Sequence, residues 1–204
     1  MEKVFTIIED CAPYYVRFTH PNIEQLIEVS KCAVSDIPFI KPFTNSIINR
    51  ENIIDIQKLC PLFDLFDIAQ ERISMFVSQP GLYYRAHKDG LYHKFSLNYT
   101  VKVLDDKCVT SWYSDKDLAG YKIDNLVNKT SRECTGFDKT KHTPLKSMTA
   151  KPNECILFNT DIFHDWDNTA SNNERMILTL RLKNYSKPGS TFEDARQIIL
   201  QMRD

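Results

Sequence analysis

The sequence predicts a mainly β protein with supporting helices, and its hydrophobic pattern carries that prediction. Between positions 95 and 103, apolar residues take the odd positions and polar residues the even ones, which is the period of a strand with one buried face. The residues from Met176 to Leu182 follow the same period, with Ile177 as the one apolar residue on the other face. Helical patterns lie before these strands and after them, which favours an antiparallel sheet structure with helices on one side.

The composition is that of an ordinary globular protein. Of the 204 residues, 42% are hydrophobic and 26% are charged, and the formal net charge is -1. This charge balance disfavours duplex nucleic acid as a partner, and no apolar run is long enough to span a bilayer. The six cysteines form no CxxC pair, which is typical of reduced thiols in a cytoplasmic compartment.

We expect a single domain over residues 1–204, because a chain of this length can bury one substantial core. Its first part, residues 1–80, reads as a helix-rich support. Residues 82–182 read as the strand core, interrupted by an insertion at 114–147 that is rich in Lys, Asp, Asn and Thr. Residues 190–203 read as a C-terminal helix.

The first 80 residues contain both strand and helix signals. The segment from Val4 to Phe18 predicts two short strands joined by a turn near Ala12 and Pro13. A helix is expected from Pro21 to Val29, and another from about Leu62 to Met75, because apolar residues recur at helical spacing. The stretch 38–50 reads as a loop or an edge strand, and Gln79-Pro80-Gly81 reads as a turn.

Further strands are expected where apolar or alternating runs lie between turn signals: 82–87, 94–104, 108–113, 156–159 and 176–182. The turn Asp105-Asp106-Lys107 predicts that the second and third of these form a hairpin. Ser190 to Glu193 matches a capping box, which predicts a helix from Thr191 to about Met202. A double-stranded jelly roll, or double-stranded β-helix of the cupin-like type, fits these strands, and its mouth is a natural place for a small-molecule site.

His87 and Asp89 are the centre of the predicted site. They lie two residues apart, so a strand would place both side chains on the same face. A second imidazole, His164, follows Asp89 by 75 residues and could be brought beside them by another strand. Two histidines and one carboxylate form the facial triad that leaves coordination positions open on a non-haem Fe(II).

A cation follows this triad at a suitable spacing. Arg175 lies 11 residues after His164, at the start of the next predicted strand. Arginine is the side chain suited to gripping a carboxylate at two points. Arg181 shares the strand face of Arg175 by parity, and it is a second candidate for the same role.

The pattern His87-x-Asp89, His164 and Arg175, set among jelly-roll-like strands, resembles the Fe(II)/2-oxoglutarate-dependent dioxygenases. The resemblance is greatest to small prolyl-hydroxylase-like and aspartyl/asparaginyl-hydroxylase-like members from microbes and viruses. It covers roughly residues 83–182.

The closing segment carries part of the likeness. Phe158 precedes Phe163-His164, then Asn168, and Glu174-Arg175 opens an alternating strand. The resemblance implies Fe(2+) held by the two histidines and the aspartate, with 2-oxoglutarate and O2 as co-substrates. It implies that the far carboxylate of 2-oxoglutarate pairs with Arg175, and that a peptide or small molecule is hydroxylated with release of succinate and CO2.

Several residues keep alternative interpretations. Asn98, on the polar side of its strand, and Tyr84, just before His87, are candidate co-substrate contacts, although a solvated sheet face or sheet packing would explain them equally. His93 is the rival to His87 and reads as a surface residue or a substrate contact. His20 and His142 read as structural or surface residues.

Two other functions fit the same pattern. One is a cupin-like metalloenzyme, an isomerase or a hydrolase, that does not use 2-oxoglutarate. The other is a non-catalytic jelly roll that serves binding or assembly. If the chain is an enzyme, we expect the insertion with Tyr121, Arg132 and Phe137 to be a lid that selects the substrate.

Overall fold

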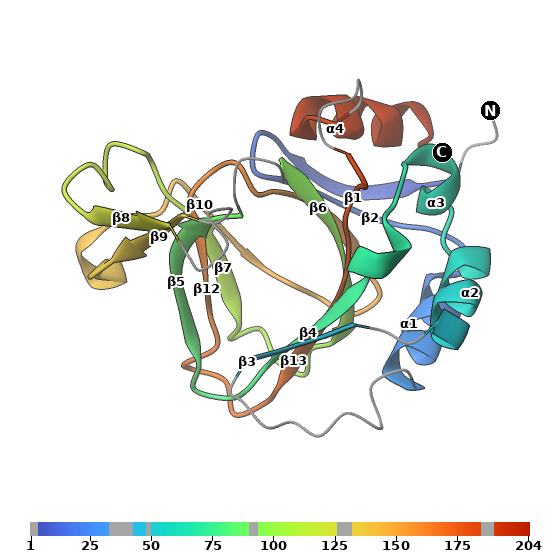
Figure 1. The fold of residues 1–204 in the computed structure, drawn as a ribbon, viewed down its shortest axis with the longest axis horizontal. Helices are drawn as coiled ribbons and strands as arrows, with labels where there is room; N and C mark the ends of the chain where they lie inside the picture. The colour runs from blue at the N-terminus through green and yellow to red at the C-terminus, as the bar shows by residue number, and fades with distance from the viewer. Residues whose placement is uncertain (1–3, 33–42, 48–49, 90–93, 126–131, 185–189) are drawn as a thin grey trace.

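The computed structural model describes residues 4–32, 43–47, 50–89, 94–125, 132–184 and 190–204, and their strands form two sheets (Figure 1). The larger sheet runs in the order β1 (Thr6–Cys11), β2 (Tyr15–Thr19), β11 (Cys155–Asn159), β6 (Phe95–Lys102), β13 (Arg175–Leu180), β4 (Ser74–Ser78) and β3 (Phe43–Ile47). The smaller sheet runs in the order β10 (Lys146–Thr149), β7 (Val109–Trp112), β12 (His164–Asp167), β5 (Tyr83–Lys88), β9 (Arg132–Thr135) and β8 (Lys122–Asn125).

The strands from β4 to β13, apart from β8 and β9, form a double-stranded β-helix. β11, β6, β13 and β4 are neighbours in the larger sheet, and β10, β7, β12 and β5 are neighbours in the smaller one. The chain therefore crosses from one sheet to the other at almost every turn, and the two sheets face each other across an interior (Figure 1). The predicted fold class is confirmed.

The main hydrophobic core lies on the outer side of the larger sheet. The helices α1 (Ile23–Cys32), α2 (Arg50–Leu59), α3 (Leu62–Leu65) and α4 (Phe192–Gln201) lie on this side (Figure 1). The core takes alternate residues from the central strands: Phe95, Leu97, Tyr99 and Val101 of β6, and Met176, Leu178 and Leu180 of β13. The predicted alternation is confirmed, and it leaves the other face of β6 and β13 to the interior.

The strands and the helix expected in the first 30 residues are present as β1, β2 and α1, and α1 buries Ile23, Leu26 and Ile27. The edge strand that was one alternative for 38–50 is β3, which pairs with β4. Residues 38–42 and 48–49 lie outside the described residues.

The helix expected from Leu62 to Met75 is wrong. Helix α3 ends at Leu65, a short 3-10 turn follows at Gln70–Arg72, and Ser74–Ser78 is strand β4. The apolar residues of this segment are buried as the helical pattern required, but long-range pairing of β4 with β13 decides its conformation. Helix α2, at Arg50–Leu59, was not predicted.

The hairpin expected between residues 94–104 and 108–113 is also wrong, because these strands lie in different sheets. β7 pairs with β10 and β12, whereas β6 pairs with β11 and β13.

The capping box of α4 is shifted by one residue: Thr191 is the N-cap and Asp194 returns the bond, in place of Ser190 and Glu193. Among the described residues, no helix has both the length and the apolar character needed to cross a membrane.

His20 has a structural position, in agreement with its sequence interpretation. Its side chain is 4% exposed, and its Nε2 atom lies 3.0 Å from the Tyr99 hydroxyl. Burial lowers the pKa of His20 to about 4, because a buried imidazolium would lose its hydration. The folded state therefore favours the neutral form of the His20 side chain.

We expect this burial to make the fold acid-sensitive at mildly acidic pH. The unfolded chain binds the proton more tightly than the folded chain, so stability present above pH ~6.5 is lost as the pH falls toward the folded-state pKa of His20. Between pH 7 and pH 4.5 the loss should be roughly 2–3 kcal/mol. Urea denaturation at both pH values measures it. The His20→Gln variant should show a smaller difference, and an equal difference in both proteins would contradict this assignment.

Candidate metal centre

The structure brings His87, Asp89 and His164 together. β5 and β12 are antiparallel neighbours, and their register places His87 directly opposite His164. The two imidazole centroids are 4.4 Å apart, and one donor atom from each of the three residues lies within 4.8 Å of the others. Among the described residues, this is the one group of three or more His, Cys, Asp and Glu side chains with that geometry.

Both imidazoles are oriented by the main chain. The Nδ1 atom of His87 lies 2.8 Å from the Arg85 carbonyl oxygen, and that of His164 lies 2.8 Å from the Ile162 carbonyl oxygen. Since a carbonyl only accepts, each Nδ1–H donates, and each Nε2 keeps its lone pair for another partner. Both rings therefore present the nitrogen that a metal ion requires.

The protonation states also suit a cation. Burial lowers the pKa of His164 to about 3, and the neighbouring His87 adds to the effect. Burial alone would raise the pKa of Asp89, but the neighbouring His87 and the charge of Arg181 hold that pKa well below its usual range. At neutral pH, Asp89 is ionised and His164 is neutral, as metal ligation demands.

A cavity of about 280 Å³ lies between the two sheets, and the three residues form part of its wall. The inner face of β13 forms another part through Arg175, Ile177 and Thr179, and Arg181 continues this alternation just after the strand ends. This is the strand face that the sequence assigned to the two arginines.

The two arginines lie at opposite ends of the cavity. Arg175 is the first residue of β13 and Arg181 follows its last residue, so at strand spacing roughly 20 Å separates their Cα atoms. Arg175 is 5% exposed, and its Nη1 lies 3.4 Å from the Cys108 sulfur, while its buried Nε has no partner among the described residues. Arg181 lies at the other end, with its Nη2 3.7 Å from Asp89 Oδ2.

Asn98 and Tyr84 both line this cavity. The Tyr84 ring stacks on Trp166 with centroids 5.8 Å apart, and its edge meets His87 at 4.6 Å. The Oδ1 atom of Asn98 is buried without a hydrogen-bond partner among the described residues. Tyr84 therefore packs against His87 and also forms part of the cavity wall. Asn98 has a side-chain oxygen that can accept a hydrogen bond from a ligand.

Several cavity residues were missed from the sequence: Phe76, Ser78, Ser96, Thr110, Phe158 and Trp166. Trp166 could have been found, because it lies two residues after His164 and therefore faces the same side of the strand. The rival histidine, His93, lies outside the described residues, as does the side chain of Arg132.

The described part of the insertion packs beside and behind the smaller sheet. β9 pairs with β5, so that Glu133 lies opposite His87, and β8 continues the sheet outward (Figure 1). Phe137 and Tyr121 belong to a hydrophobic cluster with Ala86 of β5 and Phe163. His142 donates to or accepts from the Tyr121 hydroxyl at 2.8 Å, which agrees with its structural interpretation.

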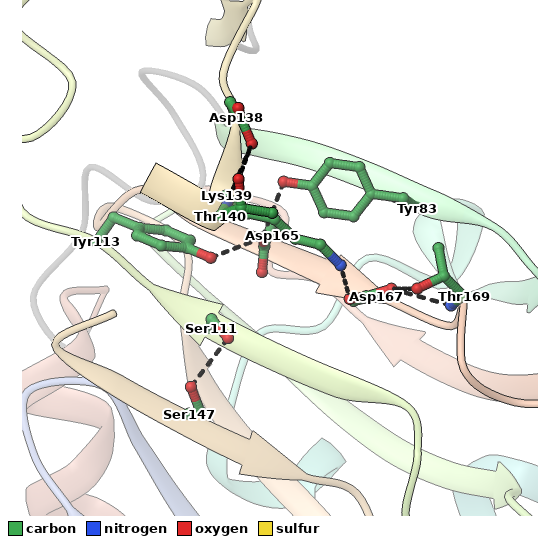
Figure 2. Close-up of polar contacts among 10 residues, drawn as sticks. All are labelled: Tyr83, Ser111, Tyr113, Asp138, Lys139, Thr140, Ser147, Asp165, Asp167 and Thr169. Carbon is green, nitrogen blue, oxygen red and sulfur yellow. Dashed lines mark hydrogen bonds and ion pairs between the residues drawn. The ribbon is translucent and has the colours of Figure 1, made fainter. Parts of the chain in front are cut away.

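A buried carboxylate ties the strands together on the outer face of the smaller sheet (Figure 2). Asp165 follows His164, and its Oδ2 accepts hydrogen bonds from Tyr83 at 3.0 Å and from Tyr113 at 2.9 Å. These tyrosines come from β5 and from the end of β7, the two strands that flank β12. Burial raises the pKa of Asp165, and the two phenol hydrogen bonds oppose that rise.

The insertion reaches the same face. Lys139 pairs with Asp167 of β12, and its ammonium lies 4.8 Å from the centroid of the Tyr83 ring (Figure 2). The outer face of β12 is therefore held by polar bonds at two successive outward positions, Asp165 and Asp167.

Comparison with known proteins places the fold. The sequence matches no protein-family model and no curated protein. The epimerase SnoN, crystallised with Fe3+, α-ketoglutarate and nogalamycin RO, has a similar structure with a TM-score of 0.54 and 8% sequence identity, covering 82% of this chain and 78% of SnoN. EvdO2 from Micromonospora carbonacea var. aurantiaca gives a TM-score of 0.52 at 12% identity, covering 89% and 94%. The chain shares the fold of these two proteins.

We expect the three clustered residues to bind a divalent metal ion. His87→Ala should weaken Ni(II) binding by more than about 100-fold, because loss of even an outer partner of a metal ligand costs about 10–100-fold. Isothermal titration calorimetry measures the affinity. His142→Ala is the matched control, since it removes a histidine of the insertion, and it should bind Ni(II) as the wild type does. Equal affinities in His87→Ala and wild type would contradict the site.

The bonds to Asp165 should stabilise the fold. Tyr113→Phe removes one phenol donor and leaves a buried carboxylate with fewer bonds, which should lower the free energy of unfolding by about 1–3 kcal/mol. Chemical denaturation measures it. Tyr121→Phe, whose hydroxyl contacts His142 rather than a buried acid, should cost less. A larger loss in Tyr121→Phe would contradict the role given to Asp165.

Proposed function

We propose that this chain is an Fe(II)- and 2-oxoglutarate-dependent oxygenase that hydroxylates its substrate and releases succinate and CO2. One observation carries the proposal: His87, Asp89 and His164 converge on the wall of a cavity that also holds the buried guanidinium of Arg175. Two imidazoles and one carboxylate, with coordination positions left open, suit non-haem Fe(II).

The donor set fits the metal. Both histidines present Nε2, the aspartate is ionised, and all three line one cavity. In the proposal, His87, Asp89 and His164 hold Fe(II), and their strands keep the donor atoms in place without the ion. When bound, iron and 2-oxoglutarate supply the oxygen-activating chemistry, and the protein supplies orientation and shielding.

Arg175 fits the far carboxylate of 2-oxoglutarate better than Arg181 does. Four carbon–carbon bonds of about 1.5 Å each separate the two carboxylate carbons, so the anchor must lie away from the metal ligands. Arg181 contacts Asp89 itself, whereas Arg175 lies at the opposite end of β13 with an unpartnered Nε. In the proposal, Arg175 binds that carboxylate at two points.

The chain's other cavity residues shape the space between these ends. Tyr84 and Trp166 form a stacked aromatic wall, which excludes water beside the two histidines. Asn98 adds an amide with an unpartnered Oδ1 for a polar group of the co-substrate or the substrate. In the proposal, each of these residues binds or orients the co-substrate or the substrate, and none accepts a proton.

A small molecule is the substrate class we favour, with a peptide as the alternative. SnoN, whose fold this chain shares, was crystallised with nogalamycin RO, and the near-neutral charge of the chain disfavours duplex nucleic acid. We further propose that residues 1–204 form one domain of the prolyl-hydroxylase-like or aspartyl/asparaginyl-hydroxylase-like group. We place it in the cytoplasm, where its six cysteine thiols would stay reduced.

The alternative functions explain less of the cavity. A cupin-like isomerase or hydrolase has no use for a buried arginine with a free donor at the far end. A non-catalytic jelly roll would need neither the converged ligands nor the cavity. Binding of N-oxalylglycine, an unreactive analogue of 2-oxoglutarate, separates these possibilities, because a bound ligand raises the melting temperature.

The experiment that tests the proposal is succinate formation by the purified chain. We expect succinate from 2-oxoglutarate only when Fe(II) and O2 are both present, with slow uncoupled turnover in the absence of substrate. Asp89→Ala should lose both this turnover and Fe(II) binding. A wild-type protein that binds Fe(II) but neither binds N-oxalylglycine nor forms succinate would refute the proposal.

The anchor role of Arg175 predicts a graded response. Arg175→Met should raise the KM for 2-oxoglutarate by about 10- to 100-fold, because charged hydrogen bonds are worth about 1.5–3 kcal/mol, and Arg175→Lys should raise it less. Steady-state succinate assays measure both. Lys102→Met removes a nearby cation that pairs with Glu174 on the surface, and it should leave KM unchanged. An unchanged KM in Arg175→Met would assign the anchor elsewhere.

A further inference from the structure

The two oxygens of Asp89 face different partners. Oδ1 lies 3.4 Å from His87 Nε2, the atom that faces the ligand cluster. Oδ2 lies 3.7 Å from Nη2 of Arg181. One oxygen of the carboxylate is therefore directed to the metal position, and the other is directed to a guanidinium.

Arg181 is held in this place from more than one side. Its guanidinium lies 5.7 Å from the centroid of the Phe76 ring, a distance at which the ring face attracts a cation. Its side chain is 25% exposed, and its Nε is buried with no partner among the described residues. The guanidinium thus remains partly desolvated beside Asp89, and it keeps one donor for an anionic oxygen in the cavity.

The division of the carboxylate matters for coordination. An octahedral ion that takes one oxygen from Asp89 and one nitrogen from each histidine keeps three open positions. If both oxygens of Asp89 bound the ion, two positions would remain. A keto acid that chelates through two atoms then leaves none for O2, so a carboxylate bound by one oxygen is the arrangement that admits both.

We propose that Arg181 is the positioning residue that keeps Asp89 bound through one oxygen. By pairing with Oδ2, it holds that oxygen away from the metal and preserves the position that the keto acid needs. Its free Nε–H also adds a donor for an anionic oxygen at this end of the cavity. The inference rests on the proposed function, because it concerns the same metal and co-substrate, and it gives Arg181 a role distinct from the anchor role of Arg175.

Calorimetry and cobalt spectroscopy test this role without catalysis. In the Ni(II)-loaded protein, Arg181→Met should bind N-oxalylglycine about 10- to 100-fold more weakly than wild type, in line with the loss of an interaction with a charged group. Its affinity for Ni(II) should stay within a few-fold. Arg181→Gln, a second uncharged variant in case Arg181→Met fails to fold, should behave alike. Arg181→Lys, which restores a cation, should recover most of the affinity.

The cobalt spectrum reports the coordination directly. Visible absorption of the Co(II)-loaded protein depends on which atoms bind the ion, so Arg181→Met, in which a second Asp89 oxygen would replace a water, should show a band altered from wild type, and Arg181→Lys should resemble wild type. A merely structural role would not change this spectrum in a folded variant. Lys183→Met is the matched control: it removes an exposed cation, 54% exposed and paired with Asp67, and it should change neither measurement.

The outcomes separate the two proposals. A wild-type protein that fails to bind Ni(II) or N-oxalylglycine overturns the proposed function, and with it the role of Arg181. A wild-type protein that binds both, together with a folded Arg181→Met or Arg181→Gln variant of equal affinity and equal spectrum, overturns only the role of Arg181.

Discussion

The pairing of β5 with β12 is the constraint on which the rest of the site depends. It places His87 opposite His164 across two neighbouring strands, and Asp89 follows from the same strand end. Because strand side chains alternate, a slip of one residue would turn an imidazole away from the cavity. The hydrogen bonds from Tyr83 and Tyr113 to Asp165 hold the same register from the outer face of β12. The same strand pairing therefore positions both the inward-facing His164 and the outward-facing Asp165.

The two sheets contribute different side chains to the cavity. The smaller sheet and the residue after β5 provide the three candidate ligands, and the smaller sheet also provides the stacked aromatic wall. Strand β13 of the larger sheet and the residue after it bring the two arginines to the cavity. The larger sheet can carry charge on its inner face because its outer face is buried under helices, which supply the hydrophobic stabilisation that the polar interior does not. In the proposed function, the far carboxylate of 2-oxoglutarate supplies the negative partner that the buried cation of Arg175 requires.

The sequence was most informative where burial on one side produces a simple period. β6 and β13 could be predicted from alternation alone, and the spacing of His87, Asp89, His164 and Arg175 is chemically unusual enough to indicate a shared site. β4 could not be predicted, because the apolar residues around Ile73 also fit the end of a helix, and only pairing with β13 settles the matter. The ion pair between Arg181 and Asp89 joins a strand end to a residue 92 positions away, and no local pattern encodes such a contact.

The main-chain acceptors behind the two imidazoles have a consequence for the protein when no metal ion is bound. In small zinc domains the ligands are ordered only when the ion arrives, so removing the ion unfolds the chain. Here the carbonyl oxygens of Arg85 and Ile162 already restrain both rings, and the hydrophobic core lies on the far side of the larger sheet. The proposed metal ion would therefore meet side chains that are already ordered by folding, and its removal should leave the fold intact.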